Sequence, residues 1–484
     1  MNTLRFSRFR RAAGRRASCH RLPALLLIPL LLSACSSFSP DGGMSTVSSL
    51  TQERIGHAIP HPASEAAAAA AQTVDALLSR PLTADAAVQV ALLNNAGFKA
   101  DLQAMGIAEA DLVQAGRLRN PGFSFARMRR DDEIEIDRSI MFDLVGLLTM
   151  PLRTGIEQQR FEQAKLQAAA QAVQLAHATR RAWFRAVAAA QTAQYMEQVR
   201  DAAQASAELA SRMAAVGNLP QLDRLREQAF QSDALAQLAR SRHAAIAARE
   251  ELARLMGVWG AQAGFSLPDR LPALPASPRA AGQLEADAMR QRLDLQMATR
   301  SAQATASMLG LTRKTGVINA VELGYQNKTD TGKNRSDGYE ISLELPLFDW
   351  GGARVARAQA IYMQSVQRTA DLAVRARSEV RQSWSAYRTS YDLARHYQQD
   401  LVPLRKRISE EVLLRYNGML TGVFELLADA REQINTVNGA IDAQRDFWLA
   451  ETDLESAVNG SGTGSSGSAP SRSAASASAP RAAH

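Results

Sequence analysis

Aromatic residues and helix-breaking residues are scarce in this chain of 484 residues. Only 6% of the residues are Phe, Trp or Tyr. Ala, Gln, Arg and Leu dominate, while Gly and Pro are confined to a few punctuating positions. Ala and straight-chain residues lose little conformational freedom on entering a helix. The composition therefore predicts a mostly α protein dominated by long helical hairpins, instead of two or three globular domains, and the strand patterns described below add a small β part.

Cysteines and catalytic motifs are also lacking. The two cysteines, Cys19 and Cys35, lie in the N-terminal segment, so no disulfide is expected and stability must come from packing. The sequence has no G-x-S-x-G, P-loop or H-E-x-x-H motif, and its seven histidines are scattered. His57 and His61 lie among prolines with no further ligand nearby, so neither a metal site nor any cofactor is expected. These absences argue against an enzyme.

The N-terminal segment 1–34 has the pattern of a secretory signal. It holds seven arginines and no acid, followed by the apolar run Leu22–Leu32, which is too short to span a bilayer as a helix. Without those arginines the formal charge falls from +8 to +1, so the basic pI says little about nucleic-acid partners. The sequence Leu-Ser-Ala-Cys at 32–35 resembles the bacterial lipobox. This resemblance implies a lipid-anchored Cys35 and, with Ser36 next, sorting to the outer membrane; an ordinary signal peptide that ends in Cys is the alternative.

The rest of the chain is internally duplicated. Trp183 and Trp384 are 201 residues apart, and so are Gly217 and Gly418. We expect a lipidated tether at 35–80 with one or two helical turns, a first repeat at 81–258, a linker at 259–282, a second repeat at 283–458 and a disordered, Gly-, Ser- and Ala-rich tail at 459–484. Each repeat should run helix, two strands, very long helix, turn, shorter helix.

Each half contains one pair of alternating strands. The pattern of apolar and polar residues predicts strands at 122–128, 134–148, 317–326 and 339–347, with polar turns between the members of each pair. Such alternation is usual for a sheet half-buried on a soluble core. Four strands cannot close a barrel within one chain, so a membrane barrel would require several protomers to pool their strands.

Two uninterrupted helices are predicted at 152–216 and 353–417. Each has 65 residues and would extend roughly 95 Å at 1.5 Å per residue, far beyond a globular domain. Apolar residues at steps of three and four along the second helix indicate a coiled-coil seam, and Pro403 should kink or break it. Shorter helices are expected at about 82–119, 219–257, 283–312 and 420–458.

The order of these elements and a few motifs resemble the TolC family of outer-membrane factors. The motifs are Asn120-Pro121 before the first strand, LPLFDWGG at 345–352 and RYNG at 415–418 ahead of ELLADA at 425–430. The resemblance implies a homotrimer with a 12-stranded β-barrel on an α-helical tube, four strands coming from each protomer. It also implies a periplasmic adaptor and an inner-membrane pump of the resistance-nodulation-division type as partners.

The resemblance further assigns roles to particular residues. The apolar strand faces would meet lipid, and the acids on the other face would line the lumen. The turns at Gly217 and Gly418 would form the periplasmic tip, where acidic residues of three protomers close the duct. The gate candidates are Glu425, Asp429 and, in the first repeat, Asp223, unless they are ordinary solvated helix charges. The candidate lumen acids are Glu135, Asp137, Asp143, Glu340 and Glu344.

The function indicated is the outer-membrane channel of a tripartite efflux system that passes small molecules or metal cations. A type I secretion duct is one alternative, because the substrate is chosen by the pump and not by the exit tube. A non-transporting periplasmic coiled-coil lipoprotein is another, although a plain rod would not need two strand pairs. The sequence leaves the substrate and the cognate pump open.

Overall fold

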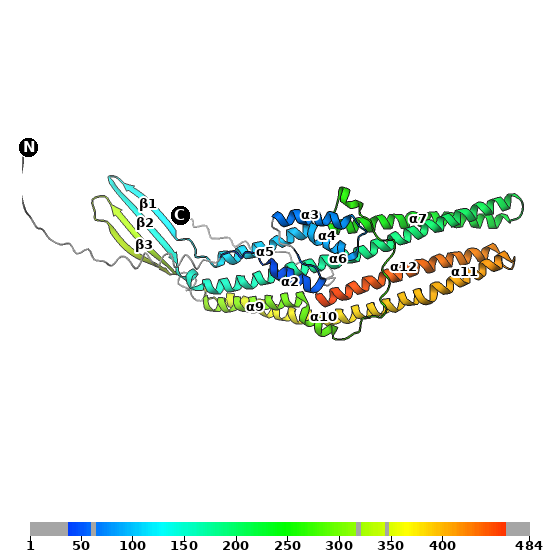
Figure 1. Ribbon diagram of the computed structural model, residues 1–484. Helices are drawn as coiled ribbons and strands as arrows, with labels where there is room; N and C mark the ends of the chain where they lie inside the picture. The colour runs from blue at the N-terminus through cyan, green and yellow to red at the C-terminus, as the bar shows by residue number, and fades with distance from the viewer. Residues whose placement is uncertain (1–36, 60–63, 316–320, 344–347, 461–484) are drawn as a thin grey trace, which may run out of the picture.

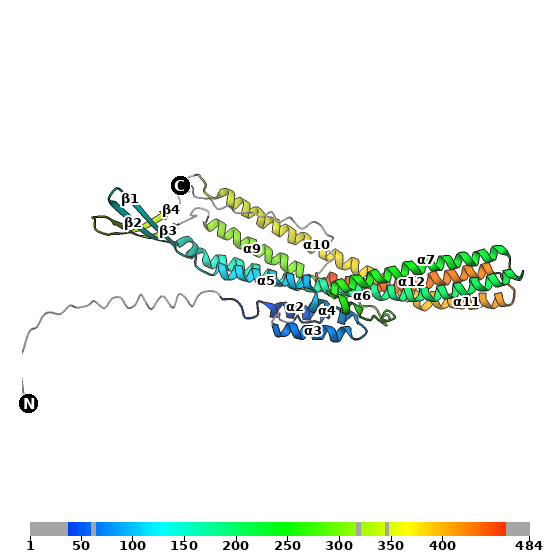
Figure 2. The same cartoon turned by 90° about the horizontal axis from the view of Figure 1, so that it is seen from above.

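The computed structural model is an elongated rod with a β-sheet at one end and helical hairpins extending to the other (Figure 1). It describes residues 37–59, 64–315, 321–343 and 348–460. Cys35 and the signal segment, His61, Glu344 and most of the C-terminal tail lie outside the described residues. The view in Figure 2 confirms that the sheet and the hairpin turns lie at opposite ends of the rod.

The four strands form one antiparallel sheet in chain order: β1 (Gly122–Arg130), β2 (Glu133–Asp143), β3 (Val321–Asp330) and β4 (Ser336–Leu343). The pairing of β2 with β3 joins the two halves of the chain. The second strand was expected to reach Leu148, and this was wrong. The carboxylate of Asp143 accepts a hydrogen bond from the backbone N–H of Gly146 at 2.7 Å and starts a helix at Leu144.

In the first half, α4 (Ala84–Asn94) and α5 (Ala96–Ala115) precede the strands. The long helix α6 (Leu144–Ala215) follows them and returns through α7 (Gln221–Met256). At 72 residues, α6 is longer than predicted and extends about 110 Å. Beyond α7, a short 3₁₀ turn, η1 (Gly260–Gly264), opens the linker between the halves.

The second half has the same order. It begins with α8 (Leu284–Gln291) and α9 (Leu293–Thr315); beyond its strands come α10 (Gly352–His396), α11 (Val402–Asn417) and α12 (Val423–Asn459). The predicted break at Pro403 is confirmed, because a π-helical turn, η2 (Tyr397–Leu401), separates α10 from α11. Pro403 has no N–H for the carbonyl of Gln399, so the helical hydrogen-bond ladder shifts there.

The segment before the first repeat has more structure than the one or two helical turns expected. It forms α2 (Met44–Ile55) and α3 (Ser64–Leu78). Val47 is fully buried and Met44 and Ile55 nearly so, in a core cluster shared with Phe161 of α6. This core replaces the free tether that the Ser- and Pro-rich composition indicated.

Two expected helices are each interrupted once, for the same physical reason. The end of α7 contacts the interruption at Asn95, where the Asn95 side chain donates a hydrogen bond to the carbonyl of Leu255 at 2.9 Å. The interruption at Arg292 receives the end of α12, because its guanidinium donates to the carbonyl of Ala457 at 2.9 Å. Each break therefore holds the last turn of the final helix of its half.

Only glycine fits at position 257, the residue that follows α7 and lies against Asn95. Its φ is +69°, and a Cβ there would lie 3.0 Å from the Cα of Asn95. Gly217 has a similar φ of +79° but open space around it. We therefore expect Gly217→Ala to cost about 1–2 kcal/mol of stability from backbone strain alone. Gly257→Ala should cost a further 1–3 kcal/mol, roughly, from overpacking. Thermal unfolding followed by circular dichroism tests this, and equal losses in the two variants would contradict the close contact.

Candidate functional site

The register of the sheet places most of the large apolar side chains and the predicted lumen acids on opposite faces. Residues paired directly across neighbouring strands share a face. Phe123 pairs with Ile140, Ile140 with Tyr325 and Tyr325 with Tyr339, which makes one apolar row. By the two-residue alternation, this face, here called the apolar face, carries at its end near the helices Phe123, Phe125, Ile140, Phe142, Leu323, Tyr325, Tyr339, Ile341 and Leu343. Toward the β1–β2 and β3–β4 turns the same face carries the polar residues Arg127, Arg129, Arg138, Asn327 and Asp337.

The opposite face of the sheet, here called the acidic face, carries four of the five predicted lumen acids: Glu135, Asp137, Asp143 and Glu340. Glu135 forms an ion pair with Lys328, and Asp137 accepts a hydrogen bond from Gln326 at 2.8 Å. Asp143 lies at the base of the sheet, where it also caps α6 and pairs with Arg119 at 3.3 Å. Three of the acids on the acidic face are therefore held in place by ion pairs or hydrogen bonds.

Neither face of the described strands is covered by a helix (Figures 1 and 2). On the apolar face, Phe123 is 68% exposed, Tyr339 86% and Ile341 71%. A sheet of a soluble domain buries its apolar face, and burying a large side chain is worth about 1.5–3 kcal/mol. An apolar face left bare in the single chain therefore points to lipid or a partner.

The two turns at the far end of the rod differ by one residue. In the first turn the N–H of Asn218 donates to the carbonyl of Met213 at 2.9 Å, and in the second the N–H of Leu420 donates to that of Arg415 at 2.9 Å. These equivalent bonds are 202 residues apart, whereas Gly217 and Gly418 are 201 apart. Gly217 therefore corresponds to Met419, which takes the left-handed conformation with φ of +59°.

With this one-residue shift, the predicted gate acids of the two hairpins fall into register. Asp223 is the third residue of α7 and Glu425 the third of α12. Asp223 pairs with Arg226 at 3.0 Å, and Glu425 accepts a hydrogen bond from Thr421. One helical turn further, Asp429 accepts a hydrogen bond from Ser409 of α11.

The counterpart of Asp429 in the first hairpin is Glu227, which the sequence reasoning missed. Glu227 is 3% exposed and accepts a hydrogen bond from Ser206 of α6 at 2.8 Å. Phe230 of α7 and Leu427 of α12 belong to one core cluster beside it. The signal was present in the sequence, because each hairpin carries two acids four residues apart, but an offset of 201 hides the match.

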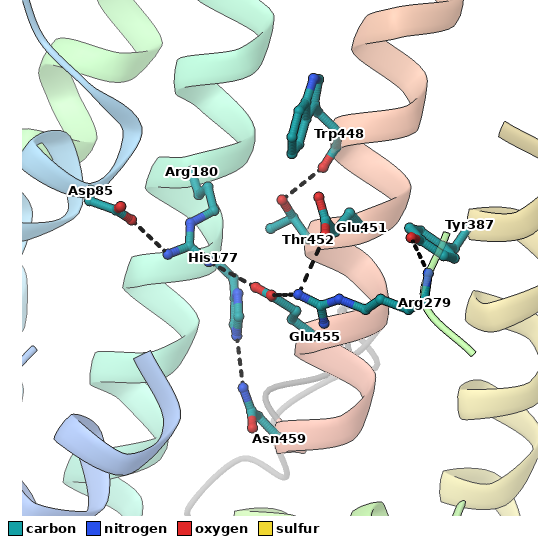
Figure 3. Close-up of polar contacts among 10 residues, drawn as sticks. All are labelled: Asp85, His177, Arg180, Arg279, Tyr387, Trp448, Glu451, Thr452, Glu455 and Asn459. Carbon is teal, nitrogen blue, oxygen red and sulfur yellow. Dashed lines mark hydrogen bonds and ion pairs between the residues drawn. The ribbon is translucent and has the colours of Figure 1, made fainter. Parts of the chain in front are cut away.

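An ion-pair network links the hairpins halfway along the rod (Figure 3). Arg180 of α6 lies between Asp85 of α4 at 3.0 Å and Glu455 of α12 at 2.8 Å. From the linker, Arg279 pairs with Glu455 at 2.8 Å and Glu451 at 3.4 Å. This network fixes the linker and both halves of the chain to one another.

Buried groups around this network have shifted pKa values. Burial raises the pKa of Glu451 above its usual range. Burial, reinforced by Arg180 and Arg181, lowers the pKa of His177 to about 3. His177 is therefore a neutral group at ordinary pH, and its contact with Asn459 at 3.4 Å is a contact between uncharged side chains.

Within the ranges that the structure describes, no three His, Cys, Asp or Glu side chains group in a way that could hold a metal ion. None of the helices in those ranges carries an apolar stretch of the length that crossing a lipid bilayer requires.

Solved structures with this architecture include membrane channels. No family model and no curated protein matches the sequence. A membrane protein from Pseudomonas aeruginosa matches with a TM-score of 0.68 and 20% identity, over 80% of this chain and 94% of that one. CusC matches with a TM-score of 0.65 and 17% identity, over 80% and 92%. The Campylobacter jejuni CmeC outer membrane channel matches with a TM-score of 0.64 and 13% identity, over 81% and 86%. The chain has the TolC-type fold.

Within the TolC-type fold, the buried Glu227 predicts a pH-dependent contact near the turns. Burial, the largest influence, raises the pKa of Glu227 above its ordinary value of 4.5. Its contribution to stability is therefore complete below pH 4.5 and is lost as the pH rises through the raised pKa. We expect the stability gained by Glu227→Gln, relative to wild type, to grow with pH.

Thermal unfolding of both proteins across a pH series measures this difference. Glu208→Gln on α6 is the matched control, because Glu208 is exposed. A difference between wild type and Glu227→Gln that stays constant with pH would show that Glu227 does not titrate with folding.

Proposed function

We propose that this chain is the outer-membrane channel component of a tripartite efflux system, passing small molecules or metal cations from the periplasm to the exterior. The observation that carries the proposal is the bare four-stranded sheet, apolar on one face and acidic on the other. Such a sheet suits a barrel wall between lipid and water. It is too small to close alone, so three chains would pool twelve strands.

The remaining parts of the molecule fit this assignment. The helical hairpins would form a periplasmic tube, and the turns at Gly217 and Gly418 its tip, where a periplasmic adaptor and an inner-membrane pump of the resistance-nodulation-division type would engage. Glu425, Asp429 and Asp223 would form the constriction at this tip. Acylation of Cys35 would anchor the chain to the outer membrane. CmeC is described as an outer membrane channel, and CusC by its transmembrane channel formation.

Ion selectivity of the purified, lipidated protein in a planar bilayer tests the proposal. Glu340 on the acidic face should attract cations into the lumen, so Glu340→Gln should shift the reversal potential in a salt gradient toward lower cation preference. Asp337→Asn is the matched control, because Asp337 lies on the same strand but on the other face. A protein that carries no current in any condition would contradict the proposed channel. An effect of Asp337→Asn alone would contradict the assignment of the two faces of the sheet.

A further inference from the structure

One pocket occurs twice in the rod, once in each half. The first pocket, of about 550 Å³, lies between the residues that lead into α4 (81–85), one side of α6, one side of α12 and linker residues between 268 and 272. The second pocket, of about 600 Å³, lies between the residues that lead into α8 (281–286) and the corresponding side of α10. The segments entering α4 and α8 are 200 residues apart.

The side chains that α6 and α10 contribute to the two pockets correspond. Arg180, Trp183 and Phe184 line the first pocket. At a spacing of 201, Arg381, Trp384 and Ser385 line the second. An ion pair across the pocket recurs as well. Arg180 reaches Asp85 at 3.0 Å, and Arg381 reaches Glu285 at 3.5 Å.

The second pocket lacks two parts of the first: the linker residues Pro268, Arg270 and Pro272, and a helix wall. In the first pocket α12 supplies the helix wall, where Trp448 stacks on Phe184 with ring centroids 5.3 Å apart. Glu455 of the same helix pairs with Arg180 at 2.8 Å (Figure 3). The second pocket is lined only by the α8 and α10 sides among the described residues. The side chain of Arg381 is accordingly 61% exposed, against 20% for Arg180.

The tryptophans reflect the same difference. Trp183 is 2% exposed, and its indole N–H donates to the carbonyl of Leu82 at 2.8 Å. Trp384 is only partly buried, and its indole N–H has no hydrogen-bond partner among the described residues. A buried donor without a partner costs roughly 1–3 kcal/mol, so the second pocket is incomplete in the single chain.

We propose that α7 of a second copy of this chain supplies the missing wall. By its place after the turn, α7 is the counterpart of α12, and the starts of the two helices are 202 residues apart. At that spacing the counterpart of Trp448 is Ile246, which is 60% exposed on α7. An exposed apolar side chain therefore lies on α7 at the position equivalent to Trp448 in the first pocket.

Charge complementarity supports the same partner. Glu250 lies one helical turn beyond Ile246 and is exposed on α7. With Ile246 against Trp384 and Ser385, Glu250 comes within reach of Arg381 of the other copy. At the spacing of 202 the counterpart of Glu455 is Ala253, so the second carboxylate for Arg381 would come from Glu250, one helical turn earlier on α7.

This contact is head-to-tail, because the second half of one copy meets the first half of the next. Contacts of this kind build a ring if the rotation closes and a filament if it does not. The inference rests on the proposed trimeric duct, in which three copies close the ring. It adds the residues through which neighbouring copies recognise each other at mid-height.

Thiol cross-linking of the full-length protein in membranes tests the contact. Cells would co-express two variants, Ile246→Cys in one copy and Ser385→Cys in the other, and a short bismaleimide would be added. Ala244→Cys replaces Ile246→Cys in the matched control, because it is also exposed but points about 200° away around α7. Wild type and each variant alone report the background from native cysteines.

We expect covalent dimers from the 246–385 mixture, severalfold above the 244–385 mixture, and covalent trimers when both cysteines are in one chain. Equal cross-linking at 244 and 246 in a protein that native mass spectrometry finds trimeric would overturn the contact and leave the duct intact. A monomeric protein without cross-links would overturn both the contact and the trimeric duct.

A charge exchange gives a second readout that does not depend on cysteines. Arg381→Glu should weaken association of the copies, measured as the trimer fraction after dilution in detergent. Adding Glu250→Arg in the same chain should restore it, because the pair is reversed. A trimer fraction that is unchanged in the single variant, or unrestored in the double variant, would overturn the pairing of Arg381 with Glu250.

Discussion

Replacing Glu425 and Asp429 together by alanine should weaken block of the channel by divalent cations at least about tenfold. In a threefold assembly these two residues place six carboxylates around the tip. A screened attraction of about 1.4 kcal/mol, summed over all six carboxylates, changes the affinity for a divalent cation tenfold. We therefore expect the concentration of Mg²⁺ that halves the single-channel current to rise at least about tenfold.

The control for this experiment removes the same charge from the same helix. Asp442 and Asp446 lie farther from the turn on α12. Arg445 pairs with Asp442 at 2.5 Å and with Asp446 at 2.8 Å. The double variant Asp442→Ala with Asp446→Ala should keep the wild-type block. Equal effects of the two double variants would mean that the tip acids are ordinary solvated charges of the helix.

Replacing Arg292 by alanine should be among the most destabilising single substitutions in the chain. Arg292 is 1% exposed and joins three elements at the break before α9. Its guanidinium pairs with Asp294 at 2.6 Å and Glu379 of α10 at 2.8 Å, and donates to the carbonyl of Ala457 at 2.9 Å. Removing one partner of such a buried cluster costs about 3–5 kcal/mol.

Arg290→Ala is the control, because Arg290 is an exposed partner of Asp287 in the preceding turn. A surface pair of this kind contributes about 0–1 kcal/mol. Arg292→Lys should fall between the two, since lysine keeps the charge but cannot bond two partners with a planar fork. Thermal unfolding in detergent measures all three variants. Similar midpoints for Arg292→Ala and Arg290→Ala would show that the break at Arg292 carries no stability.

The strands and long helices could be predicted because their signals are local. Alternation along the strands and helix-favouring composition along α6 and α10 are properties of neighbouring residues. Pro403 likewise acts on its own helix, and the break in hydrogen bonding lies where the sequence indicated. The boundary at Asp143 was missed because alternation continues past it, while the cap it forms with Gly146 ends the strand.

What the sequence did not reveal depends on contacts between distant segments. The helix breaks at Asn95 and Arg292 exist because the ends of α7 and α12 bond there, 160 and 165 residues away. The packing of α2 on α6 has the same non-local origin. Glu227 was missed because a one-residue difference between the turns becomes visible only through their hydrogen bonds.

The central claim is that the sheet separates lipid from water, and spin labels on β4 test it most directly. Ile341 lies on the apolar face and Ser342 on the acidic face. In lipid bilayers containing the assembled protein, a label at 341 should be relaxed mainly by oxygen, which concentrates in lipid. A label at 342 should be relaxed mainly by a water-soluble nickel chelate. Labels at both positions that respond to the nickel chelate alone would place the sheet outside the membrane and contradict the channel.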